Sequence, residues 1–372
     1  MKRFEQLDQV FDEMLKREGV VDERTFAVLM HRYASAHKLK GAIKMFYRRR
    51  EFGLEVDSAA FQTLLLALCR YKHVEEAESL FHEKIEEFPP DIKTLNIILN
   101  GWCVLGNVRE AKRFWKDVVS YRRCKPDIFT YGIFINALTK AGKLGSALKL
   151  FRGMWKKGFT LTPDVAICNC IIDALCFKKR IPEALDIFGK MNERGCSPNV
   201  VTYNSLIKHL CHIQRMEKVY KLLEEMEQMK GSCEPNSVTY NYLLKSMKKP
   251  KDVFELLERM ETYGCKVTSD TYNLILKLFM YWNHADGIRS TWIEMEKNGV
   301  GPDQRSFTIM VHGLYKQGKK EEALWHFNEM KTKGIIPEPR TILLMKDIET
   351  TMKKRERERG NKCEVVVINC NS

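Results

Sequence analysis

The sequence lacks the features that mark membrane and exported proteins. No apolar run approaches the roughly 18 to 20 residues that span a bilayer, so we expect no contact with a membrane. Residues 1–19, MKRFEQLDQVFDEMLKREG, have no apolar centre and do not resemble a signal peptide. Glu5, Asp8, Asp12 and Glu13 make the same stretch too acidic for an organelle transit peptide. We therefore expect no targeting peptide in this sequence.

Motifs of common catalytic and metal sites are also missing. There is no P-loop, no G-x-G-x-x-G after a strand and no G-x-S-x-G. His73-Val74-Glu75 matches half of a zinc deaminase signature, but the P-C-x-x-C half is absent. His209 and His212 lie one helical turn apart without a third ligand. We therefore expect no catalysis, no metal site and no cofactor.

The composition favours an all-helical protein. The chain is rich in Leu, Lys, Glu, Met and Ala and has few alternating runs of Val, Ile and Thr. Its 62 basic and 48 acidic residues give a net charge of +14. Nucleic acid or an anionic surface is therefore a reasonable partner, although solubility alone explains such a charge equally well.

A repeat with a period of about 35 residues runs through the chain. Nine units can be aligned on the triplet Thr-Tyr-Asn, and their lengths vary from 32 to 37 residues. The units are residues 23–57, 58–91, 92–127, 128–164, 165–199, 200–236, 237–268, 269–303 and 304–338. Each reads as a first helix, a short break and a second helix. A fixed period in the thirties is typical of stacked helical hairpins.

Three residue types keep phase with this repeat. Methionine recurs near the end of the second helix at Met154, Met191, Met226, Met260, Met295 and Met330. Alanine marks one position of that helix at Ala42, Ala77, Ala111, Ala147, Ala184 and Ala323, where a small side chain lets the paired helix approach. Proline is the next-to-last residue of seven units, at Pro90, Pro126, Pro163, Pro198, Pro235, Pro302 and Pro337. Proline there ends one unit without needing a backbone donor.

These marks predict a right-handed superhelical solenoid of antiparallel helix-turn-helix repeats. Residues 1–22 read as the second half of a unit, residues 339–355 as a capping helix and residues 356–372 as a disordered tail. The seventh unit is the shortest, and its helices are joined through KSMKKPKD. We expect an irregularity there, with Pro250 opening the second helix.

The cysteines follow the repeat and do not gather into a ligand cluster. Eight of the twelve occupy two fixed places in the units, and no pair has C-x-x-C spacing. The eight are Cys69, Cys103, Cys176 and Cys211 at one place and Cys124, Cys196, Cys233 and Cys265 at the other. Buried free cysteine behaves as a small hydrophobe, so we interpret them as packing residues in a reducing compartment.

The fifth residue of the units does not fit a packing role. In PNVVTYNSLIKHLC, residues 198–211, an apolar stripe is formed by Tyr203, Leu206, Ile207 and Leu210, and Asn204 lies off it. Asparagine is a poor helix-interior residue, yet it fills the fifth place in five units, as Asn96, Asn169, Asn204, Asn241 and Asn273. An amide carries both a donor and an acceptor, which suits the edge of a base.

The last residue of each unit is explained by its place before a helix. Asp, Asn or Thr immediately before a helix is an ordinary N-cap, and capping alone explains eight of the nine last residues.

The pattern V-V-T-Y-N-S-L-I … L-C … A-L-x-x-F-x-x-M-x-x-x-G-x-x-P-N resembles the pentatricopeptide repeat family, in its plain P-class, which is abundant in plant organelles. The resemblance covers about residues 23–338. The W-x-x-L-G-x-x-Y signature of the related tetratricopeptide repeats is absent. Membership would imply a solenoid that reads one base of single-stranded RNA per repeat.

The resemblance assigns base reading to the fifth and last residues of each unit. In chain order the pairs are Ala27 with Asp57, Gln62 with Asp91, Asn96 with Asp127, Gly132 with Asp164, Asn169 with Asn199, Asn204 with Asn236, Asn241 with Thr268, Asn273 with Asp303, and Thr308 with Glu338. By the family's code, Asn with Asp favours uracil and Asn with Asn favours a pyrimidine. Units three, eight and, more loosely, five to seven should follow a pyrimidine-rich stretch, whereas units one, two, four and nine depart from the usual pairs. Basic residues two places after a first-helix leucine, Arg70, Lys140 and Lys316, are expected to face phosphate.

The expected function is therefore sequence-selective binding of single-stranded RNA by a monomer, in organellar RNA stabilisation, processing or translation. A protein-binding helical scaffold is the alternative, and protein partners of RNA processing fit either. The resemblance favours the mitochondrion over the chloroplast.

Overall fold

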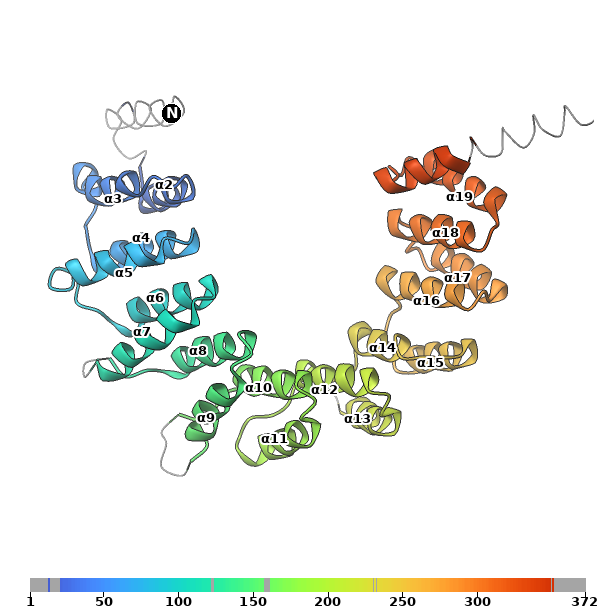
Figure 1. Cartoon of the computed structure of the whole chain (residues 1–372), viewed down its shortest axis with the longest axis horizontal. Coiled ribbons are helices and arrows are strands. Elements are labelled where there is room, and N and C mark those ends of the chain that lie inside the picture. The colour runs from blue at the N-terminus through green and yellow to red at the C-terminus, as the bar shows by residue number, and fades with distance from the viewer. Residues whose placement is uncertain are drawn as a thin grey trace, which may run out of the picture. The chain divides into compact units, whose positions relative to one another are not determined.

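The structure, a computed structural model, describes residues 13, 21–121, 124–156, 161–229, 231, 233–348 and 350. All regular secondary structure in these residues is helical, so the prediction of an all-α helical-repeat solenoid is confirmed for them (Figure 1). The chain divides into two compact units, Met1–Pro198 and Asn199–Ser372, here called the N-terminal and C-terminal units. The expected half-repeat 1–22 and tail 356–372 fall almost wholly outside the described residues.

The described residues of the N-terminal unit form five helix pairs. They are α2 (Glu23–Ser35) with α3 (Leu39–Arg48), α4 (Ser58–Arg70) with α5 (Val74–Glu83), α6 (Ile92–Leu105) with α7 (Val108–Ser120), α8 (Ile128–Lys140) with α9 (Leu144–Met154), and α10 (Val165–Phe177) with α11 (Ile181–Glu193). A 3₁₀ turn, η1 (Arg49–Phe52), follows α3. The first helices of consecutive repeats pack side by side, and the second helix of each of the first four repeats also contacts the first helix of the next.

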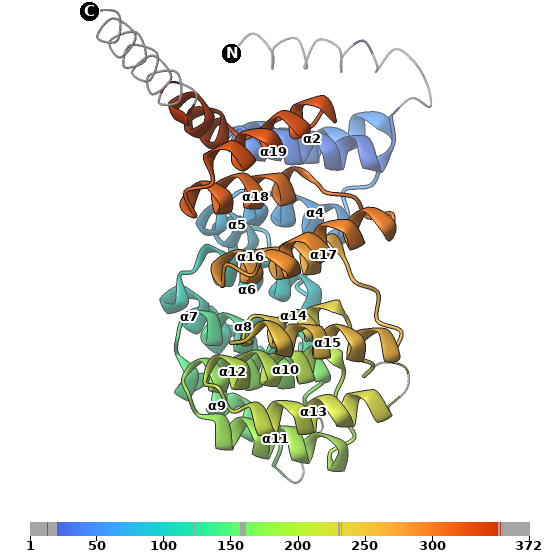
Figure 2. The same cartoon turned by 90° about the vertical axis from the view of Figure 1, so that its right-hand side faces the viewer.

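Four further pairs lie in the part of the C-terminal unit that the structure describes. They are α12 (Val200–His212) with α13 (Met216–Gln228), α14 (Ser237–Leu244) with α15 (Pro250–Thr262), α16 (Ser269–Tyr281) with α17 (Ala285–Lys297), and α18 (Gln304–Lys316) with α19 (Lys320–Thr332). Residues 339–348 are also helical. The first helices α12, α14, α16 and α18 again lie in sequence against one another (Figure 2).

The phased residues form the core of each repeat. Tyr203, Leu206, Ile207 and Leu210 are buried, as the stripe on α12 predicts. The six phased alanines are fully buried, and the six phased methionines are at most 1% exposed. Close helix contact also explains Gly101 on α6, because a Cβ there would lie 2.8 Å from the Cys69 sulfur. Dispersion and apolar burial between neighbouring hairpins therefore hold the stack together.

The N-caps explain why helices start where they do. A helix begins at the first residue of each of the nine aligned units, and the residue before it is Asp, Asn or Thr in all nine. All nine of these side chains, Asp22 and the last residues of units one to eight, accept a hydrogen bond from a backbone N–H of the first turn. Each such cap contributes about 1 kcal/mol, so these side chains stabilise the helix starts whether or not they also bind a ligand.

The seventh repeat departs from its neighbours. Its first helix, α14, has eight residues, whereas α12, α16 and α18 each have thirteen. Pro250 is the first residue of α15, where its missing N–H costs no helical hydrogen bond. This repeat is therefore shorter than its neighbours because its first helix ends earlier.

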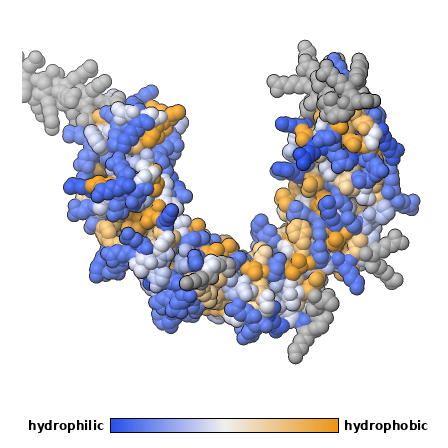
Figure 3. Space-filling view, turned by 180° about the vertical axis from the view of Figure 1, so that it is seen from behind, coloured by the Kyte–Doolittle hydropathy of each residue, from blue (hydrophilic) through white to orange (hydrophobic). Residues whose placement is uncertain are grey.

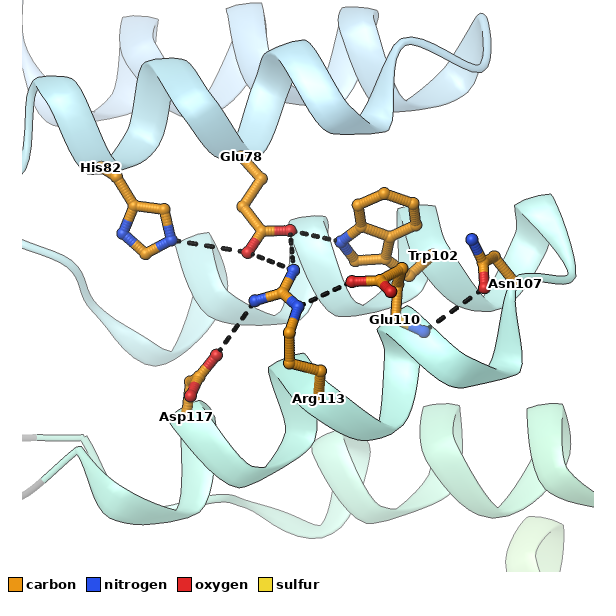
Figure 4. Close-up of polar contacts among 7 residues, drawn as sticks. All are labelled: Glu78, His82, Trp102, Asn107, Glu110, Arg113 and Asp117. Carbon is orange, nitrogen blue, oxygen red and sulfur yellow. Dashed lines mark hydrogen bonds and ion pairs between the residues drawn. The ribbon is translucent and has the colours of Figure 1, made fainter.

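Neighbouring repeats of the N-terminal unit are joined by a buried carboxylate. Glu78 on α5 is 5% exposed and accepts hydrogen bonds from Arg113 Nη2 on α7 at 2.7 and 2.8 Å. Trp102 Nε1 on α6 donates to the same carboxylate at 2.6 Å (Figure 4). Hydrogen bonds with Glu110 and with Glu78 raise the pKa of the Arg113 guanidinium. One carboxylate thus ties three helices of two repeats together.

A comparable pair joins repeats in the C-terminal unit. Arg259 on α15 donates from Nε and Nη2 to Glu227 on α13 at 2.8 and 2.6 Å, and the Tyr240 hydroxyl donates to Glu227 at 3.1 Å. Bidentate guanidinium–carboxylate contacts fix the relative position of two helices better than a single hydrogen bond can.

Across the residues that have been described, we find no helix with the length and apolar character needed to cross a bilayer.

Candidate nucleic-acid interface

The fifth and last residues of a repeat meet in space at three places. Asn273 Nδ2 on α16 lies 3.3 Å from both carboxylate oxygens of Asp303, the N-cap of α18. Asn96 on α6 likewise donates to Asp127, the N-cap of α8. This meeting follows from the packing, because adjacent first helices lie side by side and the cap of one sits beside the first turns of the other.

The second repeat makes the same contact with a different amide. Gln62 Nε2 on α4 donates to both oxygens of Asp91 at 3.0 and 2.9 Å and to Thr94 Oγ1 at 3.1 Å. The sequence predicts no particular base for this unit, because Gln62 with Asp91 departs from the usual residue pairs. Glutamine carries the same amide group as asparagine on a side chain one methylene longer, and this similarity could have predicted the contact with Asp91.

The amide oxygens of four fifth-position asparagines are buried and face no donor in the described part of the chain. Oδ1 of Asn96, Asn204, Asn241 and Asn273 has no hydrogen-bond partner among the described residues. Asn96 and Asn273 are 6% and 2% exposed, whereas Asn204 and Asn241 are partly exposed. A buried acceptor without a donor costs about 1–3 kcal/mol, so each of these amides gains by meeting an N–H group.

The remaining predicted pairs are arranged differently. Asn236 Oδ1 accepts from Thr239 N and Oγ1 at 3.1 and 3.2 Å, and Thr268 caps α16. The Thr308 hydroxyl donates to the Gln304 carbonyl on its own helix at 2.8 Å, while the Glu338 carbonyl accepts from Thr341 N at 2.9 Å. The fifth unit's pair is divided between the two compact units, with Asn169 on α10 and Asn199 capping α12.

Cavities open where the fifth residue is small. Ala27 borders a cavity of about 250 Å³, Gly132 one of about 520 Å³ and Thr308 one of about 700 Å³. Lys140 lines the Gly132 cavity and Lys316 lines the Thr308 cavity, so two predicted phosphate ligands lie beside the fifth residue of their own repeat. Arg70 is exposed at the end of α4.

Apolar surface accompanies these polar groups. Val104 and Phe129, which line the Gly132 cavity, are 75% and 64% exposed. Hydrophobic patches between hydrophilic areas are visible on both units (Figure 3). An exposed aromatic ring such as that of Phe129 suits the stacking of nucleobases, and any base can stack because each has a flat π-face.

Hydrogen bonds keep three last-residue carboxyl groups ionised. Burial by itself would raise the pKa values of Asp91, Asp127 and Asp303, but hydrogen bonds hold all three below the ordinary value. The donors are groups in the first turn of the next helix and the fifth-position amides Gln62, Asn96 and Asn273, with Ser269 adding a bond to Asp303. These amides therefore also have a structural role, because they stabilise the N-cap of the next repeat.

Asn273→Ala is expected to raise the pKa of Asp303, since the variant removes one donor to the carboxylate. A lowered pKa stabilises the fold above about pH 4, and this contribution is lost as the pH falls through the folded-state value. The variant should lose part of it. An NMR titration of Asp303 measures the change, and Asn241→Ala, whose partner Thr268 has no carboxyl, is the control. An Asp303 pKa equal to that of the wild type in Asn273→Ala would contradict the assignment.

Six of the ten cysteines in the described residues are buried, and the other four are partly buried. Burial raises the pKa values of the Cys69 and Cys103 thiols to about 12, which keeps them protonated at neutral pH. In the described part of the chain, no three His, Cys, Asp or Glu side chains are grouped as a metal ion requires.

Models of one protein family match segments throughout the repeat region. A family model described as PPR repeat family matches residues 90–140, 163–212 and 198–249, and one described as PPR repeat matches 59–87, 129–159 and 305–335. A model described as pentatricopeptide repeat domain matches residues 245–280.

Full-length relatives come from Arabidopsis thaliana. A putative pentatricopeptide repeat-containing protein is 56% identical over 94% of this chain and 66% of its own length. Two others are named as mitochondrial. One is 36% identical over 91% of this chain and 59% of its own length. The other is 33% identical over 91% of this chain and 75% of its own length. The chain thus spans about three fifths to two thirds of the first two relatives.

The fold is similar to a solved one. The crystal structure of the pentatricopeptide repeat protein PPR10 from maize superposes with a TM-score of 0.59 at 27% identity, and the match covers 92% of this chain and 49% of the maize chain.

Proposed function

This chain belongs to the pentatricopeptide repeat family, and from that membership we propose that it binds single-stranded RNA in a sequence-selective way. Repeats of this family read one base each through two or three side chains. The observation that carries the proposal is the meeting of the fifth-position amide with the last residue of the same repeat, as between Asn273 and Asp303.

The proposed reading follows from hydrogen-bond chemistry. A carboxylate accepts hydrogen bonds only, so Asp127 and Asp303 bind the NH₂ side of their amides and leave the carbonyl oxygen as an acceptor. The N3–H of uracil is a donor that suits this acceptor. Units three and eight then read uracil, and Asn204 with Asn236 reads a pyrimidine, so the RNA is pyrimidine-rich over part of the footprint.

The protein acts by occupancy and carries out no catalysis of its own. A bound solenoid blocks nucleases, remodels a hairpin or exposes a ribosome site, which are roles in RNA stabilisation, processing and translation. The relatives named as mitochondrial support a mitochondrial location. We propose that it works as a monomer, together with protein partners of RNA processing.

Binding of a pyrimidine-rich single strand and of the same sequence in a duplex tests the proposal. We expect the single strand to bind far more tightly, because unpaired bases alone present their edges to the repeats. If roughly 3 to 6 phosphates are neutralised, log affinity falls with log salt at a slope of about −2 to −4. Equal binding of strand and duplex, or tight binding to protein with no RNA binding, would favour a protein scaffold instead.

A further inference from the structure

A row of lysines runs along the first helices of the C-terminal unit. The ninth residue of units six, seven and eight is Lys208, Lys245 and Lys277, and all three are exposed. Each follows the fifth-position asparagine by four residues, which places the lysine one helical turn from that asparagine on the same face.

The backbone keeps this relation even in the irregular seventh repeat. Lys245 is the C-cap residue that follows α14, but it retains helical torsion angles, and its N–H donates to the Asn241 carbonyl at 3.2 Å. The side chain extends past Tyr242, with Nζ 5.7 Å from the ring. Because α12 packs against α14 and α14 against α16, the three lysines stand on consecutive neighbouring helices.

The last lysine of the row borders a basic cavity. Lys277 lines the cavity of about 700 Å³ together with Thr308, Lys316 and Arg305. The exposed ring of Tyr281 also lines this cavity. Tyr281 is the thirteenth residue of its unit, the position at which Lys140 and Lys316 are expected to face phosphate in units four and nine. Lysine at the ninth place of units six, seven and eight thus adds to the positive charge of the first helices in this unit.

The N-terminal unit has no such row. Its ninth residues are His31, Leu66, Asn100, Asn136 and Asp173. The lysines are thus a property of three particular repeats and do not follow from the repeat pattern.

We propose that Lys208, Lys245 and Lys277 bind successive phosphates of the RNA backbone, one for each repeat. This inference rests on the proposed function. A flexible ammonium group one turn from the base-reading amide can reach the phosphate of the nucleotide whose base that amide contacts. Phosphate contacts carry no sequence information, so the row sets affinity and salt dependence without setting base preference.

The test compares two triple variants of equal charge. The first replaces Lys208, Lys245 and Lys277 by glutamine. The control replaces Lys218, Lys221 and Lys251, which are exposed on the second helices α13 and α15. Binding of one pyrimidine-rich 12-mer is measured from low to high salt. We expect the first variant to make the slope of log affinity against log salt shallower by about 2, since each phosphate on a single strand contributes about 0.7.

The control should keep the wild-type slope, and a Lys→Arg triple variant at the row should restore it. The ratio of affinities for pyrimidine-rich and purine-rich RNA should stay the same in all of them. If the variant with glutamine at positions 208, 245 and 277 still binds RNA with the wild-type slope, the proposed phosphate contacts of these lysines are overturned and the proposed function is not. A wild-type protein that binds no RNA would overturn the proposed function as well.

Discussion

Replacing Arg113 by methionine is expected to lower the stability of the N-terminal unit by about 3 kcal/mol. The variant leaves Glu78 buried, with hydrogen bonds to the Trp102 indole and to His82 among the described residues. Loss of one partner from a buried ion pair is costly because the charge that stays behind is no longer compensated. Amide hydrogen exchange in α5, α6 and α7 measures the change locally, which suits a repeat protein whose stability is not uniform.

Two further variants show whether burial is the cause. Arg152→Met breaks a pair with Glu183 that is 3.2 Å long but exposed on both sides, so its cost should stay below about 1 kcal/mol. Adding Glu78→Gln to Arg113→Met should recover part of the loss, because the amide is neutral and its oxygen still accepts from Trp102. Equal costs for Arg113→Met and Arg152→Met would contradict this account.

The second large effect concerns RNA. Asn204→Ala with Asn273→Ala is expected to weaken binding of a pyrimidine-rich 12-mer by roughly 25-fold or more, since a good base contact is worth about 1–3 kcal/mol. Affinity for a purine-rich 12-mer should change much less, so the preference between the two RNAs should shrink. Fluorescence polarisation at one salt concentration measures both.

Asn192→Ala is the matched control, because Asn192 is exposed on the second helix α11. Its affinity for both RNAs should equal that of the wild type. Thermal unfolding of the double variant separates a lost base contact from a lost contact with Asp303. An unchanged preference between the two RNAs in a folded double variant would show that these amides have only their structural role.

Much of the fold follows from the period of the sequence. Helix starts coincide with capping residues such as Asp127 and Asp303, whose local chemistry needs no tertiary information. The buried alanine and methionine rows follow from phase alone, because every repeat must bury the same face on its neighbour.

Contacts between side chains of different repeats could not be predicted in this way. Glu78 and Arg113 are 35 residues apart, and nothing in their sequence context shows that this pair, unlike the many exposed ones, contains a buried carboxylate. The burial of Asn96 and Asn273 was also missed, because a position off the apolar stripe can still be covered by the neighbouring helix. Gln62 was set aside because its residue pair is unusual, although its amide makes the same contact.

The affinity of the wild-type chain for a pyrimidine-rich and a purine-rich 12-mer, at one salt concentration, tests the central claim most directly. If the fifth-position amides read bases, the pyrimidine-rich strand should bind at least about tenfold more tightly, equivalent to one base contact of about 1.4 kcal/mol. Equal affinity for the two strands would contradict base reading, whatever the strength of binding.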